Sequence, residues 1–167
     1  ELGESKGYNV SLHDSGENIR KISDVNIQNT LEASKDADYV IVVVGDNSMR
    51  YKWKDKTAGE NMDRAELNLA GKQLKLVMSL KEINKNIIVV YVNGKPISEP
   101  WIQNNIPSVI EAWEPGNLGG QAVAEIIFGD INPSGKLPLT VPRSVGQIQM
   151  IYNHKPSCLL YTSDAAD

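Results

Sequence analysis

The sequence is poor in the residue types that build disulfides and metal sites. Its 167 residues include one cysteine, Cys158, which excludes an internal disulfide and a cysteine-rich zinc site. The two histidines, His13 and His154, are isolated, with no carboxylate or cysteine at the spacing of a metal-ligand set. We therefore expect neither a metal ion nor a cofactor.

Long apolar runs and an excess of positive charge are also missing. No run approaches the roughly 20 apolar residues that a membrane-spanning helix needs. The net charge is −4, so the composition gives no reason to expect nucleic acid or a membrane surface as a partner.

The usual nucleotide and serine-hydrolase motifs are absent as well. Five residues separate Gly129 from Gly135, where a phosphate-binding loop has four, and Leu137 occupies the position of the Ser or Thr that binds Mg²⁺. No glycine pattern matches the dinucleotide-binding fingerprint, and no Gly-x-Ser-x-Gly nucleophile elbow occurs. A nucleotide-binding module is therefore disfavoured.

What the sequence contains is an alternation of short apolar runs with helical patterns, in a chain that is 41% apolar and long enough for one domain with a core. The run Val40–Val44 has no polar alternation, which is typical of a strand buried on both faces. Three buried strands are predicted: residues 39–44, 86–92 and 108–113. Helices are predicted over about residues 25–36 (capped by Ser23 or Asp24), over 97–104 and 118–127 (ended by Gly129), and along the stripe Leu67, Ala70, Leu74, Val77 and Met78.

This alternation predicts an open α/β sheet, mostly parallel, with helices on both faces: a three-layer α/β/α sandwich. Residues 8–13 are predicted to form a weak edge strand, and residues 137–142 an extended edge segment limited by its prolines. We expect the domain to cover residues 1–157, with residues 1–35 as its less certain part. Residues 158–167 fit neither pattern and resemble translated adapter sequence, so we expect a non-native tail there.

A long loop follows the first predicted strand, over residues 46–62, and emerges where ligands bind in such sheets, beyond the carboxyl ends of the strands. Arg50, Tyr51 and Trp53 lie in it among several lysines. This pattern has three interpretations: a nucleic-acid patch, a sugar-binding platform in which an aromatic face meets C–H bonds, or a solvated loop with one anchoring aromatic residue. The acidic overall charge favours the second and third.

Glu60 follows a glycine near the end of this loop, and a carboxyl group there can be aimed into a cleft. A useful general acid needs its pKa raised from about 4.3 toward about 6. From the residues alone, Glu60 fits an ordinary surface carboxylate better than an acid, with Glu114 and Asp46 as weaker candidates at strand ends. We also expect Asp63 and Arg64 to form an ion pair at the base of the loop.

Several motifs, taken in order, resemble one family. They are Ala37-Asp38-Tyr39-Val40-Ile41-Val42-Val43-Val44-Gly45; Gly59-Glu60-x-x-Asp63-Arg64-x-x-Leu67-x-Leu69; Glu111-Ala112-Trp113-x-Pro115-Gly116-x-x-Gly119-Gly120-x-Ala122; and Phe128-Gly129-Asp130-x-Asn132-Pro133-Ser134-Gly135-Lys136-Leu137-Pro138. Over about residues 35–157 the chain resembles the C-terminal α/β sandwich domain of glycoside hydrolase family 3. Residues 142–148 and 152–156 are similar to its bacterial periplasmic β-glucosidase branch.

The resemblance implies a retaining exo-β-glycosidase in which an Asp on a preceding (β/α)₈ barrel is the nucleophile and Glu60 matches the acid/base position. It implies a β-linked oligosaccharide or aryl glycoside as substrate and a periplasmic or extracellular location. With such a substrate, the sugar-platform interpretation of the loop predicts contacts from Arg50, Tyr51 and Trp53. The barrel of the same polypeptide is then the partner, and without it these residues are expected to be inactive. The alternative is a nonenzymatic carbohydrate-binding or scaffolding α/β domain.

Overall fold

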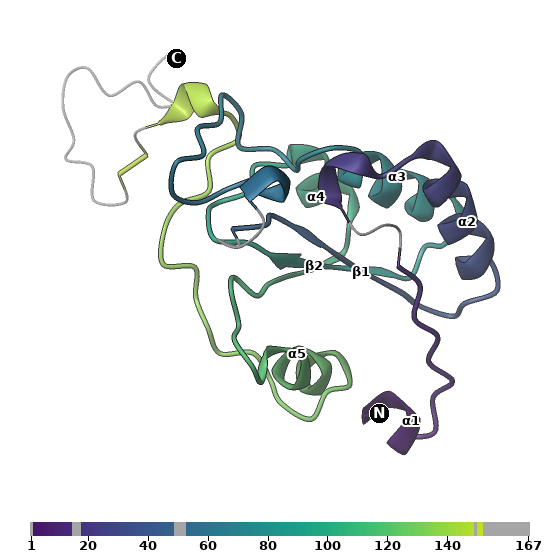
Figure 1. Cartoon of the computed structure of the whole chain (residues 1–167). Helices are drawn as coiled ribbons and strands as arrows, with labels where there is room; N and C mark the ends of the chain where they lie inside the picture. Colours follow the sequence, from purple (N-terminus) through teal and green to yellow (C-terminus); the bar gives the residue numbers. More distant parts are fainter. Residues whose placement is uncertain (1, 15–17, 49–52, 149, 152–167) are drawn as a thin grey trace, which may run out of the picture.

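A parallel β-sheet forms the centre of the computed structural model, which describes residues 2–14, 18–48, 53–148 and 150–151 (Figure 1). Within these residues the sheet has three strands in the order β1-β2-β3. They are β1 (Val40–Gly45), β2 (Ile87–Val92) and β3 (Ser108–Glu111). The predicted open α/β sheet is confirmed, and each strand begins within one residue of its predicted start.

Helices cover both faces of this sheet. In Figure 1, α2, α3 and α4 lie on one face and α1 and α5 on the other. The α-helices are α1 (Leu2–Ser5), α2 (Asp24–Ser34), α3 (Gln73–Ile83), α4 (Pro100–Asn105) and α5 (Gly119–Ile127). Three short 3₁₀ helices are η1 (Ile19–Lys21), η2 (Trp53–Asp55) and η3 (Val145–Gln147).

The crossovers explain why the strands are parallel. Val40 of β1 pairs with Ile87 of β2, and Ile88 pairs with Ser108 of β3. The connection from β1 to β2 contains α3, and the connection from β2 to β3 contains α4. Such crossovers return the chain to the same end of the sheet, so all three strands end at one edge.

Helix α2 begins where a capping residue was predicted. The N–H of Asn26 donates to Ser23 Oγ (3.1 Å), and the N–H of Ser23 donates to Asn26 Oδ1 (2.9 Å). This reciprocal pair is a capping box. Asp24 does not cap the helix but accepts from Lys72 and Lys75, each at 2.8 Å, and these cations lower its pKa to about 2.

The helix predicted from the apolar stripe over residues 67–78 is partly wrong, because α3 begins only at Gln73. Gly71 has φ +65, and a Cβ there would meet the carbonyl oxygen of Ile19 at 2.4 Å. This left-handed turn separates the earlier apolar residues from the helix. The buried positions of α3 are Gln73, Leu76, Val77 and Leu80.

Strand β1 is not buried on both faces, contrary to the prediction. Val40, Val42 and Val44 are buried against the helices α2 and α3, but Ile41 is 45% exposed and Val43 is 64% exposed. Both line an apolar pocket of about 390 Å³ between the sheet and α5. The strand buried on both faces is β2, where the successive residues Val89, Val90 and Tyr91 are all buried.

The two weaker extended predictions are wrong as strands. Residues 8–13 pair with no strand, and the ring of Tyr8 instead lies 5.1 Å from that of Phe128 at the end of α5. Residues 137–142 are also unpaired, since two of the six are prolines, which cannot donate to a ladder. Residues 158–167 lie outside the described part of the chain.

In the described ranges, no helix is long and apolar enough to cross a membrane.

The buried face of α3 predicts a large, local stability effect. Leu80 is 1% exposed, so Leu80→Ala should lower the free energy of unfolding by about 2–5 kcal/mol through lost burial and a cavity. Leu12 is 97% exposed, and Leu12→Ala should change it by less than about 0.5 kcal/mol. Urea denaturation of both variants measures this; equal losses would contradict the assigned core.

Candidate functional site

The carboxyl ends of the strands are joined to one another by backbone hydrogen bonds. The N–H of Asp46, directly after β1, donates to the carbonyl of Val92 at the end of β2 (3.0 Å). The N–H of Asn93 donates to the carbonyl of Trp113, just after β3 (3.1 Å). The strand ends therefore form one connected platform, at the edge where ligands bind in open α/β sheets.

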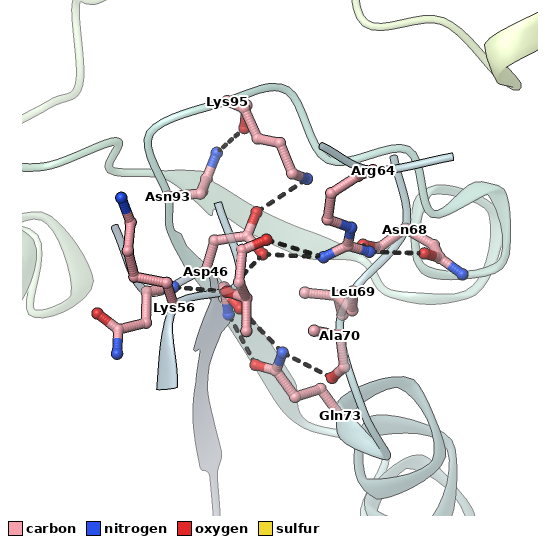
Figure 2. Close-up of polar contacts among 12 residues, drawn as sticks. Asp46, Lys56, Arg64, Asn68, Leu69, Ala70, Gln73, Asn93 and Lys95 are labelled. Carbon is pink, nitrogen blue, oxygen red and sulfur yellow. Dashed lines mark hydrogen bonds and ion pairs between the residues drawn. The ribbon is translucent and has the colours of Figure 1, made fainter. Parts of the chain in front are cut away.

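The loop leaves this platform at Gly45, where the backbone is tightly enclosed. A Cβ at Gly45 would lie 1.8 Å from the carbonyl oxygen of Val92, so only glycine fits. The buried side chain of Gln73 accepts from the N–H of Gly45 (2.8 Å) and donates to its carbonyl (2.9 Å) and to that of Ala70 (3.0 Å). The first residue of α3 thereby fixes the start of the loop (Figure 2).

Asp46 is the charged centre of the loop's base, and its side chain is fully buried. Its carboxylate lies 2.8 Å from Lys95 Nζ and 3.4 Å from Arg64 Nη1, and it accepts from Thr57 Oγ1 at 3.1 Å (Figure 2). The predicted pairing of Asp63 with Arg64 is wrong, because Arg64 turns inward to Asp46. Asp46 thus joins two partly buried cations at the base of the loop, and we assign it a structural role.

The loop has an outgoing limb, which contains Asn47, and a returning limb, which contains Thr57 and Ala58. Hydrogen bonds join the two limbs. Thr57 and Ala58, both buried, donate from their N–H groups to the carbonyl of Asn47 (2.9 and 3.3 Å), and Thr57 Oγ1 accepts from the N–H of Asn47 (2.8 Å). Arg64 also donates to the carbonyls of Thr57 (3.4 Å) and Asn68 (2.8 Å). This part of the loop belongs to the packed domain.

Lys56 is 1% exposed, although lysine is almost never buried unless its charge is partnered. Its ammonium donates to the backbone carbonyl of Glu60 (2.7 Å) and lies 4.5 Å from the ring centroid of Trp53. That second distance is within the range of a cation–π contact. The carbonyl of Lys56 itself accepts from Arg20 Nη2 (2.8 Å), which joins the loop to η1.

Glu60 lies in the turn that this lysine supports, and its side chain is exposed. The residues on both sides of it have positive φ: +92 at Gly59 and +58 at Asn61. A Cβ at Gly59 would approach Ser48 Cβ at 3.3 Å, so the turn also lies close to the outgoing limb. The carboxyl group of Glu60 is thus presented from a turn whose backbone is supported from within the domain.

Of the three residues predicted to contact substrate, the structure describes one. Trp53, in η2, is 56% exposed, with Lys56 Nζ over its ring. Arg50 and Tyr51 lie outside the described residues. Sequence reasoning missed the residues that hold this site, since polar residues with buried partners leave no periodic pattern: Lys56, Thr57, Gln73 and Lys95.

The second positive φ among the described non-glycine residues lies just after β3, at Trp113. Trp113 has φ +52, a conformation that costs of order 1–3 kcal/mol for a residue with a side chain. Its N–H donates to Glu111 Oε1 (3.2 Å), which helps to hold it. The next residue, Glu114, accepts a hydrogen bond from the hydroxyl of Ser48. This bond joins the segment after β3 to the loop after β1.

Two glutamates near the platform have pKa values raised mainly by burial. Glu99 accepts from the N–H of Leu69 (2.8 Å), and this bond and Lys95 partly oppose the shift. Burial likewise raises the pKa of Glu111, against the hydrogen bonds that it accepts. The hydroxyl of Tyr91 is buried beside them, and burial raises its pKa too. Because Glu99 is enclosed and bonded to backbone, its shift reflects the interior and not a substrate site.

Metal ligands do not gather in the part of the chain that the structure describes. It contains no group of three or more His, Cys, Asp or Glu side chains that could hold a metal ion.

Comparisons with known proteins agree with this fold. The family model described as "Glycosyl hydrolase family 3 C-terminal domain" matches residues 3–166. A β-xylosidase from Formosa agariphila is 42% identical over 141 residues, which are 84% of this chain and 18% of that protein. A periplasmic β-glucosidase from Salmonella typhimurium is 37% identical over 128 residues, 77% of this chain and 16% of that protein.

A solved structure shows the same likeness in three dimensions. A crystal structure of a GH3 β-glucosidase from Bifidobacterium adolescentis matches with a TM-score of 0.73 and 29% identity, over 86% of this chain and 20% of that one. The chain thus spans about a fifth or less of the length of these relatives.

The buried carboxylate of Asp46 predicts a loss of stability when its charge is removed. Asp46→Asn removes the counter-charge of the partly buried Arg64 and Lys95, so it should lower the free energy of unfolding by about 1–3 kcal/mol. Asp24→Asn removes an exposed carboxylate that also has two cationic partners, and its effect should be much smaller and should shrink in high salt. Urea denaturation at low and high salt compares them; similar, salt-sensitive losses would contradict a buried centre at Asp46.

Proposed function

Since this chain belongs to the glycosyl hydrolase family 3 C-terminal domain family, we propose that it serves a retaining exo-β-glycosidase that hydrolyses O-glycosyl bonds, and that it supplies the acid/base residue, Glu60. The observation that carries the proposal is the position of Glu60. It is an exposed carboxyl group in a turn that is supported by Lys56 and connected to the ends of the strands. The nucleophile is an Asp on a (β/α)₈ barrel elsewhere in the same polypeptide.

In the proposed reaction Glu60 acts twice. The nucleophilic carboxylate first bonds to the anomeric carbon while the glycosidic C–O bond breaks, and Glu60 gives its proton to the departing oxygen. A water molecule then bonds to the anomeric carbon as the glycosyl ester breaks, and the carboxylate of Glu60 takes a proton from that water. The acid form of Glu60 and the free nucleophile are thereby restored.

The geometry suits a residue that works against a second domain. In retaining enzymes the two carboxyl groups lie about 5–5.5 Å apart, across the scissile bond. A turn that projects beyond the strand ends can bring Glu60 to a cleft completed by the barrel, and pockets form preferentially at domain interfaces. Because the turn is held by the buried Lys56, little conformational freedom is lost when the cleft assembles.

Trp53 is the proposed platform for the substrate. Its ring is more than half exposed, and aromatic faces pack well against the C–H bonds of a sugar or against an aryl group. A β-linked oligosaccharide or an aryl β-glycoside offers such a surface. Arg50 and Tyr51 are proposed to contact the same substrate. The barrel, which holds the innermost sugar, determines whether glucose or xylose is preferred.

The acid/base role is tested in the full-length protein that carries this chain. Glu60→Ala should lower kcat by about 10²–10⁴-fold on substrates with poor leaving groups, which need a proton, and much less on activated aryl glycosides. External azide should partly restore activity on the activated substrates. Glu66, another exposed glutamate, provides the control Glu66→Ala, which should leave the rates unchanged. Uniform, modest losses in Glu60→Ala would place the acid elsewhere, and full activity would favour a nonenzymatic binding role.

The need for the barrel is tested with the 167-residue chain alone. Because the nucleophile lies outside it, the purified chain should give no enzymatic hydrolysis of 4-nitrophenyl β-D-glucoside or β-D-xyloside, while circular dichroism shows it folded. Saturable hydrolysis by the chain alone would contradict the two-domain proposal.

A further inference from the structure

We propose that Lys56 is a positioning residue for the acid/base carboxyl group: its buried ammonium holds the backbone at Glu60 and the ring of Trp53 in a fixed relation to each other. The inference rests on the proposed function of Glu60. Lys56 itself touches no reacting atom, and its effect passes through the backbone carbonyl that it binds.

The burial of Lys56 is the first support. An ammonium withdrawn from water needs compensating hydrogen bonds or electrostatic contacts. Lys56 finds them in two places, the carbonyl oxygen of Glu60 at 2.7 Å and the ring of Trp53 at 4.5 Å. These are the two described residues that the proposed function places against the substrate, so one side chain links the proton donor to the sugar platform.

The conformation of the turn is the second support. Gly59 and Asn61, which flank Glu60, have φ values of +92 and +58. Glycine and asparagine adopt positive φ at low cost, and they adopt other conformations at low cost too. The two residues therefore permit this turn but do not by themselves fix its conformation. The charge-assisted hydrogen bond from Lys56 to Glu60 ties the turn to the interior and limits the positions of the carboxyl group.

The anchoring of Lys56 is the third support. Its own carbonyl accepts from Arg20 (2.8 Å), and the next residue, Thr57, is bonded to Asn47 on the outgoing limb and to the carboxylate of Asp46. A continuous series of polar contacts thus runs from the end of β1 through Thr57 and Lys56 to Glu60. Movement of the turn relative to the sheet requires one of these contacts to break.

Loss of this tie should affect proton donation more than it affects binding. A misplacement of about 1 Å at a catalytic group can cost about 10²-fold in rate. Substrates that need little proton assistance are insensitive to such a misplacement. Dependence of the rate on the leaving group therefore separates a positioning role from a structural one, since a loss of folded protein lowers all rates by the same factor.

The test compares Lys56→Met with Lys54→Met in the full-length protein. Methionine keeps an unbranched apolar stem but removes the ammonium, and Lys54 is an exposed lysine of η2, two residues away. The substrates are phenyl, 4-nitrophenyl and 2,4-dinitrophenyl β-D-glucosides, with the β-D-xylosides as a second set. Lys56→Met should lower kcat on the phenyl glycoside by about 10²-fold and on the dinitrophenyl glycoside by less than about 3-fold. Lys54→Met should match the parent on all of them.

Each outcome decides the question. An equal loss on all three leaving groups, or a loss in Lys54→Met as large as in Lys56→Met, overturns the positioning role. If Lys56→Met does not fold, Lys56→Gln takes its place, because glutamine keeps a donor on a side chain one bond shorter. If neither variant folds, Lys56 is a structural residue and the positioning role is overturned. Glu60→Gln in the same assay separates the two proposals. If the loss in Glu60→Gln does not depend on the leaving group, the proposed function fails. If it does depend on the leaving group in Glu60→Gln but not in Lys56→Met, only the inference about Lys56 is refuted.

Discussion

The buried carboxylate of Asp46 is the constraint on which the site depends. It lies where β1 ends, and its cationic partners come from two other places: Arg64 from the end of the long loop, and Lys95 from the segment after β2. Removing the Asp46 carboxylate from water carries a desolvation cost, which is offset only when its contacts with the two partly exposed cations are maintained. The two ends of the loop and the neighbouring strand end are therefore held in one arrangement.

The loop built on this centre is layered from the inside outward. Asp46, Thr57 and Lys56 form the buried inner part, with the partly buried Arg64 and Lys95 beside Asp46. Glu60 and Trp53 lie outermost and are exposed. In the proposed function, such support would hold Glu60 in place through each turnover, so that the protein need not order the group again. The family to which the chain belongs, and the position of Glu60 on this support, are consistent with a proton shuttle.

The fold was more predictable from sequence than the support of the site. Runs rich in β-branched residues located β1 and β2, and Ser23 located the start of α2, because these signals depend on local chemistry. The exposure of Ile41 and Val43 was not predictable, since a run such as Val40–Val44 reads alike in a central and an edge strand. Adjacent Asp63 and Arg64 suggested an ion pair, but Arg64 bonds a carboxylate 18 positions earlier. The burial of Lys56 arises from contacts made only after folding, so composition could suggest only an ordinary solvated lysine.

The side chain of Gln73 has a consequence for the geometry of the sheet. It both accepts from the N–H and donates to the carbonyl of Gly45, which is what one residue of an adjoining strand does. The amide therefore imitates a single rung of a β-ladder on the outer side of β1, and it closes that side one residue before the loop departs. Two residues further on, the N–H and the carbonyl of Asn47 bond to Thr57, so the backbone after β1 passes from a side-chain partner on α3 to partners within the loop itself.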